Sequence, residues 1–478
     1  MGFLEQYTLK YPDGQAENDI GCLLFNTFMK TYLFVIPSAF RVNAILRTGI
    51  RRHLENEPGA KILIVSPFAN DATFRAEFPN ALHEQLPKIP LRFVRRVARA
   101  RELLLTIDKP VFVKSRLIEK SVIARHPVYA LPRTDRGLTL LRIVLYPVRP
   151  LLAWLMNKTE EYFFHFPEGV RIIEARHPHG LIMGTMTEPD DIIWLALARR
   201  YGIPAHVVDF PWSYIENRLW AVPRPAHIYL WSEMMKEEFL SNFPFPREKT
   251  HVTGCQRYDW YAREFPTIPR EEFFRRIGGD PSKRLITYFI GTPYWNPHEH
   301  DTAQLILEMI EGGELPKDTQ LVARLGWKLA PSDPFLALQK RYPNFIIQSA
   351  DELPHQEYPS HLVYYSDISL STFSSLVLDA AVLDRPHIFT ALSGSASPHP
   401  DDAATARIFE YEFVENAVAT GGVQVSYTLK DFKSRIIATV ANPAHGSADR
   451  KALAQKFLGT IDGKAGERIA KSIIAFSK

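Results

Sequence analysis

The chain has 478 residues, of which 46% are hydrophobic and 23% charged, a composition typical of globular proteins that argues against a disordered or fibrous chain. This length exceeds what one hydrophobic core usually supports, so we expect two or three domains. Only two cysteines, Cys22 and Cys255, are present, which argues against a disulfide framework. The first residues, MGFLEQYTLKYPDG, do not resemble a secretory signal, and we expect a cytoplasmic protein.

The N-terminal part of the chain is apolar before the first clear strand signal. The segment FVIPSAFRVNAILRTGIRRHL has the character of a helix, and we predict a helical extension over residues 1–59. The sequence does not distinguish between packing of this extension on the first domain and its contact with a membrane. The run AKILIVSPF then predicts a first buried parallel strand at residues 60–68, which ends in a polar loop.

A strongly basic segment follows. From Lys88 to Arg149 fifteen lysines or arginines stand against four acids, whereas the whole chain carries a net charge of only +4. The apolar stretch LTLLRIVLYPVRPLLAWLM is interrupted by two arginines and two prolines, so a membrane-spanning helix is not expected. We predict that residues 88–156 dock on anionic lipid, with a solvated basic face beside a buried helix as an equal alternative. Nucleic acid is not an expected partner, because no nucleic-acid-binding motif accompanies the charge.

The rest of the chain alternates between strand and helix patterns, which predicts βαβ units around parallel sheets. A polar, Pro- and Gly-rich stretch before residue 283 separates two such series. We therefore predict an N-terminal Rossmann-like domain at 60–262, a C-terminal one at 283–460 and a final helix at 461–478. The expected strands are VRIIEA, PAHVVDF, AHIYLW and THVTG in the first domain and RLITYFIG, QLVARLG, NFIIQSA, DISLS and PHIFT in the second.

The stretch SDISLSTFSSLVLDAAVLDRPHI places a run of hydroxyl residues between a strand and an apolar helix. Free backbone N–H groups and hydroxyls at such a junction favour an anion. We predict that Ser371, Thr372, Ser374 and Ser375 hold phosphate oxygens and that Asp379, one turn into the helix, contacts a sugar hydroxyl. A simple serine N-cap is the alternative.

Four segments, VTGCQRYD, VVDFPWSYIENRL, SDISLSTFSSLVLDAAVLDRP and DGKAGERIA, together resemble bacterial surface-polysaccharide glycosyltransferases of the GT-B fold, in the group related to CDP-glycerol glycerophosphotransferases. The resemblance covers residues 60–478. It implies two Rossmann-like domains facing across a cleft, a nucleotide-activated donor on the C-terminal domain and a glycan or lipid-linked acceptor on the N-terminal domain. It also implies that no metal or other cofactor is required.

The chain departs from this group near the expected donor site. Related sequences tend to continue Arg-x-His-Pro where this chain has Arg324, Leu325, Gly326 and Trp327. Within the resemblance, a sugar from a nucleotide-activated donor is the expected transferred group, and glycerol phosphate from CDP-glycerol is the alternative.

Without a metal, cations and backbone amides must stabilise the charge on the leaving phosphates. Gly291 and Thr292 follow the first strand of the second domain, and Arg324 and Lys328 follow a later one, so we predict donor contacts for all four. A pair of histidines flanking Glu299 offers no third ligand in the sequence, and no metal site is predicted there.

An inverting transfer needs a base that projects from the N-terminal domain into the cleft. The candidates at predicted strand ends are Asp71, His177, His179 and Asp209. Two other functions fit the same architecture. One is a non-hydrolysing UDP-sugar 2-epimerase, which needs no second substrate, and the other is an inactive scaffold that binds a nucleotide or glycan.

Overall fold

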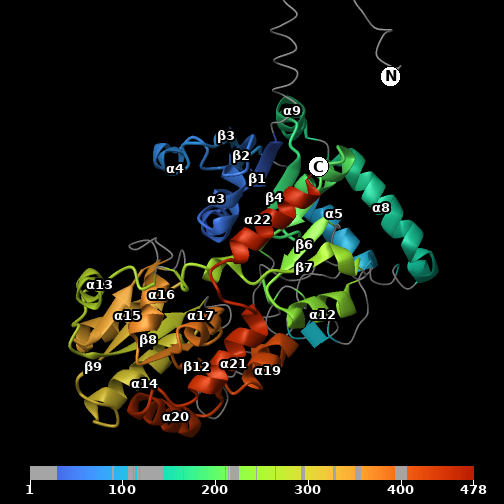
Figure 1. Cartoon of the computed structure of the whole chain (residues 1–478). Helices are drawn as coiled ribbons and strands as arrows, with labels where there is room; N and C mark the ends of the chain where they lie inside the picture. Colours follow the sequence, from blue (N-terminus) through green and yellow to red (C-terminus); the bar gives the residue numbers. More distant parts are fainter. Residues whose placement is uncertain are drawn as a thin grey trace, which may run out of the picture.

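The computed structural model describes residues 30–88, 91–105, 111, 114–115, 118, 141, 144–164, 166–209, 211–213, 215, 225–243, 245–263, 265–291, 296–326, 330–349, 357–392 and 406–477. Two parallel sheets dominate it, and each is covered by helices (Figure 1). The predicted α/β architecture of two Rossmann-like domains is therefore confirmed.

The first sheet has seven strands in the order β3-β2-β1-β4-β5-β6-β7, and all its neighbouring pairs are parallel. The strands β1, β2, β4, β5 and β6 are mostly buried, as expected of a parallel sheet covered on both faces, whereas the edge strand β3 is polar and partly exposed. The seven strands are β1 (Lys30–Val35), β2 (Ala60–Ser66), β3 (Leu82–Gln85), β4 (Gly180–Met183), β5 (Ala205–Val207), β6 (His227–Leu230) and β7 (Thr250–Val252).

Two predictions about the first domain were wrong. The segment KTYLFV is not part of a helical extension but forms β1, paired with β2 on one side and β4 on the other. Its last four residues, YLFV, are a short, buried apolar run, and such a run is typical both of a central strand and of a helix segment. The segment VRIIEA is not a strand but lies in α9 (Pro167–Arg176), which begins with proline at its first position.

The helices of the first domain cover both faces of this sheet. The helix α10 (Pro189–Arg200), which begins with a capping box of Glu188 and Asp191, is buried nearly all round and carries the fully buried Trp194. Outside it lie α5 and α8, joined by a buried ion pair of 2.8 Å between Arg101 and Glu160. The helices are α2 (Ala39–Arg41), α3 (Gly49–Glu55), α4 (Ala72–Glu77), α5 (Leu91–Leu105), α8 (Arg149–Phe163), α9, α10 (Pro189–Arg200) and α12 (Glu233–Asn242).

The second sheet has six strands in the order β10-β9-β8-β11-β12-β13, again all parallel. All five strands predicted here are confirmed, whereas the three-residue β13 gave no signal in the sequence. The strands are β8 (Arg284–Ile290), β9 (Thr319–Leu325), β10 (Phe345–Gln348), β11 (Ile368–Ser371), β12 (His387–Thr390) and β13 (Gln424–Ser426). The helices are α13 (Arg270–Ile277), α14 (Glu299–Glu311), α15 (Asp333–Arg341), α16 (Glu357–Tyr365), α17 (Leu376–Val382), α19 (Glu412–Val418), α20 (Leu429–Ala441), α21 (Ser447–Leu458) and α22 (Ala465–Phe476).

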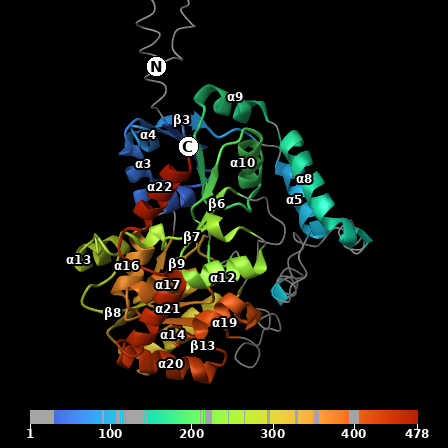
Figure 2. The same ribbon diagram turned by 45° about the vertical axis from the view of Figure 1, so that its right-hand side comes forward.

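The last helix returns to the first domain. Figure 2 shows α22 beside α3, above the second sheet. The two helices cross so closely that a Cβ atom on Gly466 would lie 2.8 Å from the Cα atom of Gly49. The predicted C-terminal helix is therefore confirmed as an element, and it packs on the N-terminal domain.

An apolar core also joins the two domains. Trp212, which follows β5, is buried, and its ring centroid lies 5.1 Å from that of Phe413 and 5.0 Å from that of Phe457. It also stacks at 6.5 Å on Phe373, which lies inside the hydroxyl run of the second domain. One continuous cluster of buried side chains thus extends from the first sheet into the second domain.

Candidate functional site

The carboxyl ends of parallel strands form the edge at which ligands bind in open α/β sheets. In the second domain, the loops that follow β8 and β11 are linked there by Glu299, the first residue of α14. Its Oε2 accepts the N–H of Gly291 at 2.9 Å, and its Oε1 accepts the hydroxyl of Thr372 at 2.8 Å. The side chain of Asn296 donates a third bond, of 3.1 Å, to the Thr372 hydroxyl.

Glu299 is a buried acid that the sequence did not single out. Burial raises the pKa of its carboxyl to about 8, although the hydrogen bonds from Thr372 and Gly291 act in the opposite direction. The group is therefore largely neutral at pH 7. A neutral carboxyl beside the start of α14 does not repel an anion there, which a carboxylate would do.

The hydroxyl run divides into two pairs. Ser371 is buried and its Oγ lies 2.9 Å from Nε2 of His387, while Thr372 is bonded to Glu299 as described above. Ser374 is half-buried and accepts the N–H of Leu376 at 3.2 Å, and Ser375 is exposed at the start of α17. The side chains of Ser371 and Thr372 are thus buried and hydrogen-bonded within the protein. Only Ser374 and Ser375 lie at the surface of the predicted phosphate site.

Asp379 joins the second domain to the segment between the sheets. It accepts hydrogen bonds from the hydroxyls of Tyr258, at 3.2 Å, and Tyr261, and the Tyr261 hydroxyl also contacts Ser360. Burial raises the pKa of its carboxyl. Both carboxylate oxygens of Asp379 therefore accept hydrogen bonds from tyrosines. The predicted partner was a sugar hydroxyl instead.

Of the other predicted donor residues, Gly291 lies at this edge through its bond to Glu299. Arg324 is buried near the end of β9, where its Nη1 donates a bond of 2.7 Å to the carbonyl of Ser349. This bond fixes the guanidinium on the neighbouring strand end. Thr292 and Lys328 lie outside the described residues.

In the first domain, Asp209 follows β5 and is fully buried. Its Oδ1 lies 3.1 Å from Nε of Arg257 and accepts a bond of 3.4 Å from Gln256, while its Oδ2 has no hydrogen-bond partner among the described residues. Burial, the largest single effect, would lower the pKa of Arg257, but Asp209 and the other acidic groups around it together raise it above the usual value. An ion pair therefore lies at the carboxyl edge of the first sheet, with one carboxylate oxygen that has no partner in the part of the chain that the structure describes.

A second buried pair lies beside it and was missed in the sequence. Arg41 donates a bond of 2.7 Å to the Thr185 hydroxyl, which is bonded to Asp191 in turn, and the guanidinium lies 3.8 Å from the Asp191 carboxylate. Burial raises the pKa of Asp191 to about 6, against the opposing effect of Arg41. Gly184 makes room for this pair, because a Cβ atom there would lie 1.6 Å from the Arg41 guanidinium.

The remaining candidate bases occupy other positions. Asp71 is the exposed N-cap of α4, where its Oδ1 accepts the N–H of Phe74 at 2.8 Å. His177 ends α9 in a left-handed conformation, and Nδ1 of His179 accepts the N–H of Thr31 at 3.2 Å. Both histidines precede β4, at the amino edge of the sheet. Their prediction as cleft residues was wrong, because the segment before them is a helix and the strand comes after them.

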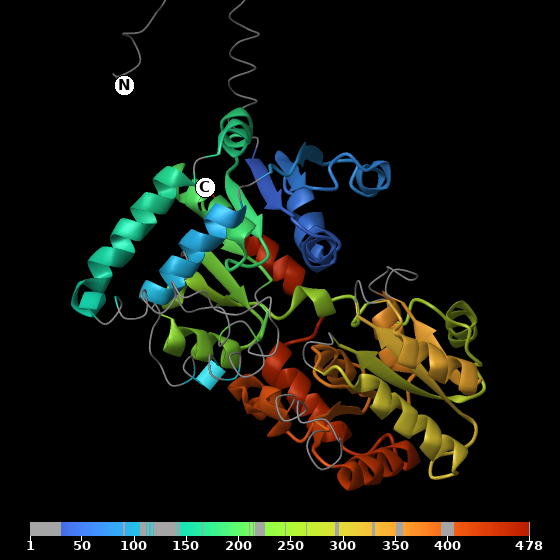
Figure 3. The same ribbon diagram turned by 180° about the vertical axis from the view of Figure 1, so that it is seen from behind.

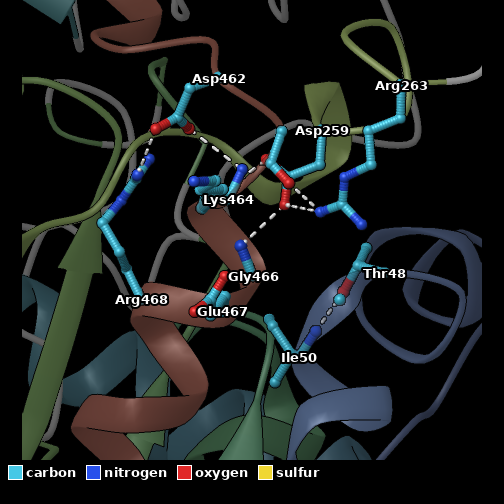
Figure 4. A network of polar contacts seen from close by, with 12 residues as sticks. Thr48, Ile50, Asp259, Arg263, Asp462, Lys464, Gly466, Glu467 and Arg468 are labelled. Atoms are coloured by element: carbon cyan, nitrogen blue, oxygen red, sulfur yellow. Dashed lines mark hydrogen bonds and ion pairs between the residues drawn. The ribbon is translucent and has the colours of Figure 1, made fainter.

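Two segments that carry the family resemblance meet in space, as Figure 4 shows. Asp259 of VTGCQRYD accepts the N–H groups of Ala465 and Gly466, at 2.9 and 2.8 Å, and so caps the start of α22 in DGKAGERIA. Arg468 of the same helix donates a bond of 2.8 Å to the carbonyl of Thr253. These segments thus fix the returning helix to the first sheet.

Comparisons with known proteins agree with this architecture. The UDP-GlcNAc 2-epimerase of Neisseria meningitidis, bound to UDP-GlcNAc, superposes with a TM-score of 0.56 at 13% identity, covering 93% of this chain and 100% of that one. The S. aureus MnaA–UDP structure gives 0.55 at 12% identity, with coverages of 94% and 97%. The UDP-GlcNAc 2-epimerase of Methanocaldococcus jannaschii gives 0.54 at 12%, with coverages of 94% and 100%. At such identities the likeness shows the fold alone.

No curated protein matches the sequence. The sequence model of the family described as CDP-Glycerol:Poly(glycerophosphate) glycerophosphotransferase matches residues 216–475, which is more than half of the chain and includes the whole second sheet. With its two Rossmann-like domains in the GT-B arrangement, the chain therefore belongs to the CDP-glycerol:poly(glycerophosphate) glycerophosphotransferase family.

Proposed function

We propose that the protein transfers a nucleotide-activated group to a hydroxyl of a surface-polysaccharide or lipid-linked glycan acceptor, in the cleft between the two sheets. The observation that carries the proposal is the donor edge of the second sheet. There, Glu299 ties the Gly291 loop to Thr372, and Ser374 and Ser375 remain at the surface. Backbone amides, hydroxyls and a neutral acid suit the phosphates of a nucleotide.

Two donors are compatible with this edge. Family membership favours CDP-glycerol, with glycerol phosphate as the transferred group. A nucleotide sugar is the donor expected from the resemblance, and it is kept as a second candidate because the chain departs from Arg-x-His-Pro at Arg324 to Trp327. In either case, we propose that Gly291, Ser374 and Ser375 contact the donor phosphates, together with Thr292 and Lys328.

The acceptor hydroxyl must lose a proton as it attacks. We propose Asp209 as the base, because its Oδ2 is a buried carboxylate oxygen with no hydrogen-bond partner among the described residues. Nε of Arg257 lies 3.1 Å from Oδ1 of Asp209, which leaves Oδ2 to accept the proton. Charge that develops on the leaving phosphates would be met by backbone N–H groups and hydroxyls, so the proposed reaction uses no metal or other cofactor.

The leaving group distinguishes these functions. Attack of the acceptor hydroxyl on the β-phosphorus of CDP-glycerol releases CMP, whereas attack on the anomeric carbon of a nucleotide sugar releases the nucleoside diphosphate. An epimerase leaves the nucleotide attached to an altered sugar. Incubation with CDP-glycerol and a panel of UDP-, GDP- and dTDP-sugars, with and without a polymer acceptor, would be followed by ion-exchange chromatography. Acceptor-dependent release of one of these products supports the proposal, and binding without any turnover would favour the scaffold instead.

We further propose that the protein docks on an anionic membrane surface through α8 and the turn before it. Six large apolar side chains here are each more than half exposed: Tyr146, Leu151, Trp154, Leu155, Tyr162 and Phe163. Figure 3 shows α8 at the outer side of the first domain, beside α5 and away from the second sheet. Among the described residues, no helix is long and apolar enough to span a bilayer. The basic excess in residues 88–149 supports anionic lipid as the partner.

A further inference from the structure

A cluster of metal-ligating side chains lies at the start of α14 and takes no part in the proposed transfer. His298, His300 and Asp301 each offer one ligand atom, and these atoms all lie within 4.8 Å of one another. Nε2 of His300 is 3.2 Å from Oδ1 of Asp301. The sequence shows only two histidines around a glutamate, and the helical turn brings Asp301 to them as a third ligand.

The backbone that carries these three side chains is held in place. The N–H of His298 donates to the Asn296 side chain at 2.9 Å, and the N–H of Asp301 donates to the carbonyl of His298 at 3.1 Å. Between the two histidines, Glu299 is anchored to the loop after β8 by its bond to Gly291. A site on fixed backbone requires only rotation of the side chains to close around an ion.

The distances are within reach of such a rotation. Zinc binds imidazole nitrogen and carboxylate oxygen at about 2.0–2.2 Å, so neighbouring ligand atoms lie about 3–3.5 Å apart. The His300 to Asp301 distance already meets this requirement, and the half-buried His298 has to move its ring nitrogen by roughly an ångström. The positive end of α14 opposes a cation, and the carboxylate of Asp301 offsets that effect.

We propose that His298, His300 and Asp301 bind one divalent transition-metal ion, with Zn²⁺ as the best match. Two imidazoles and one carboxylate favour Zn²⁺ and related ions over Mg²⁺ and Ca²⁺, which prefer all-oxygen ligand sets. Water completes the coordination. The site goes beyond the proposed transfer, which uses no metal, and it depends only on the geometry of the first turn of α14.

Titration calorimetry with ZnCl₂ on the full chain, without nucleotide, tests this site. The wild type should bind one Zn²⁺ at this cluster, and His298→Ala and Asp301→Asn should each weaken binding at least about tenfold. The matched control is His445→Ala, an exposed histidine in the loop before α21, which should leave the affinity unchanged. Thermal unfolding in EDTA shows whether each variant is folded. If His298→Ala does not fold, Asp301→Asn still tests the site, because Asp301 is exposed and its replacement should not disturb the fold.

A second readout is spectroscopic. Co²⁺ bound by two imidazoles and a carboxylate absorbs visible light, and the spectrum should disappear in the His300→Gln protein. Equal Zn²⁺ affinity in wild type and variants, or no binding by the wild type, would overturn the proposal. Because neither readout uses a donor or an acceptor, failure of the proposed transfer would leave both results interpretable.

Discussion

Glu299 is the residue whose protonation matters most at the donor edge. Its pKa is raised from 4.5 to about 8, so between these values the folded protein binds a proton that the unfolded chain releases. This carboxyl therefore destabilises the fold progressively as the pH rises from about 4.5 to 8.

We predict that Glu299→Gln removes this dependence, because its amide does not titrate, while its oxygen can accept the Gly291 N–H and its NH₂ group can donate to the Thr372 hydroxyl. Its free energy of unfolding relative to the wild type should increase between pH 5 and pH 8, as measured by urea unfolding. Glu299→Ala leaves two donors unsatisfied and should lose about 1–3 kcal/mol at pH 6. A constant difference between Glu299→Gln and the wild type across this range would contradict the assignment.

The candidate bases Asp209 and Asp71 are expected to have different roles. We predict that Asp209→Asn lowers turnover by about 10²–10⁴-fold, because the amide cannot accept the acceptor proton. Asp71→Ala should lose about 1 kcal/mol of stability through the lost N-cap of α4 and keep its turnover. Initial rates with the identified donor, together with thermal unfolding of each variant, check both statements. Loss of turnover in Asp71→Ala with normal turnover in Asp209→Asn would identify Asp71 as the base.

At the scale of elements, α8 carries the membrane prediction. Trp154 and Leu155 are 57% and 52% exposed, so replacing both by glutamate leaves the packed core intact. We expect the wild type to sediment with vesicles containing phosphatidylglycerol at low salt and the Trp154→Glu, Leu155→Glu protein to remain in the supernatant. The matched control is Leu336→Glu in α15, another exposed apolar residue, which should sediment like the wild type. Equal sedimentation of all three proteins would exclude α8 as the docking element.

The element scale also explains which predictions held. Most strands after residue 60 could be predicted because a buried parallel strand is a short apolar run bounded by polar residues, which is a local property. The same criterion failed at VRIIEA, where a helix that is half-buried on the sheet shows a similar apolar run. That single error moved His177 and His179 to the wrong edge of the sheet.

At the scale of the whole molecule, the two domains share an apolar core around Trp212. We predict that the wild type unfolds in a single cooperative transition in spite of its two sheets. Trp212→Ala should lose about 3–5 kcal/mol and separate the transitions of the two domains in calorimetry, because its contacts with Phe373, Phe413 and Phe457 cross between them. The control Trp154→Ala, at an exposed position on α8, should leave the transition unchanged. Two transitions already present in the wild type would contradict the shared core.

The sequence by itself determined the two α/β series, their order, the hydroxyl run after β11 and the family, because these depend on local runs and on motif order. The tertiary structure decided the central place of β1, the link from Glu299 to Thr372, the tyrosine partners of Asp379 and the return of α22. Each of these joins distant parts of the chain, such as Thr31 with His179, 148 residues apart, or Asp259 with Ala465, 206 residues apart. Local periodicity fixes which face of an element is apolar, whereas the partner of a buried polar group depends on which strands are neighbours in the folded sheet.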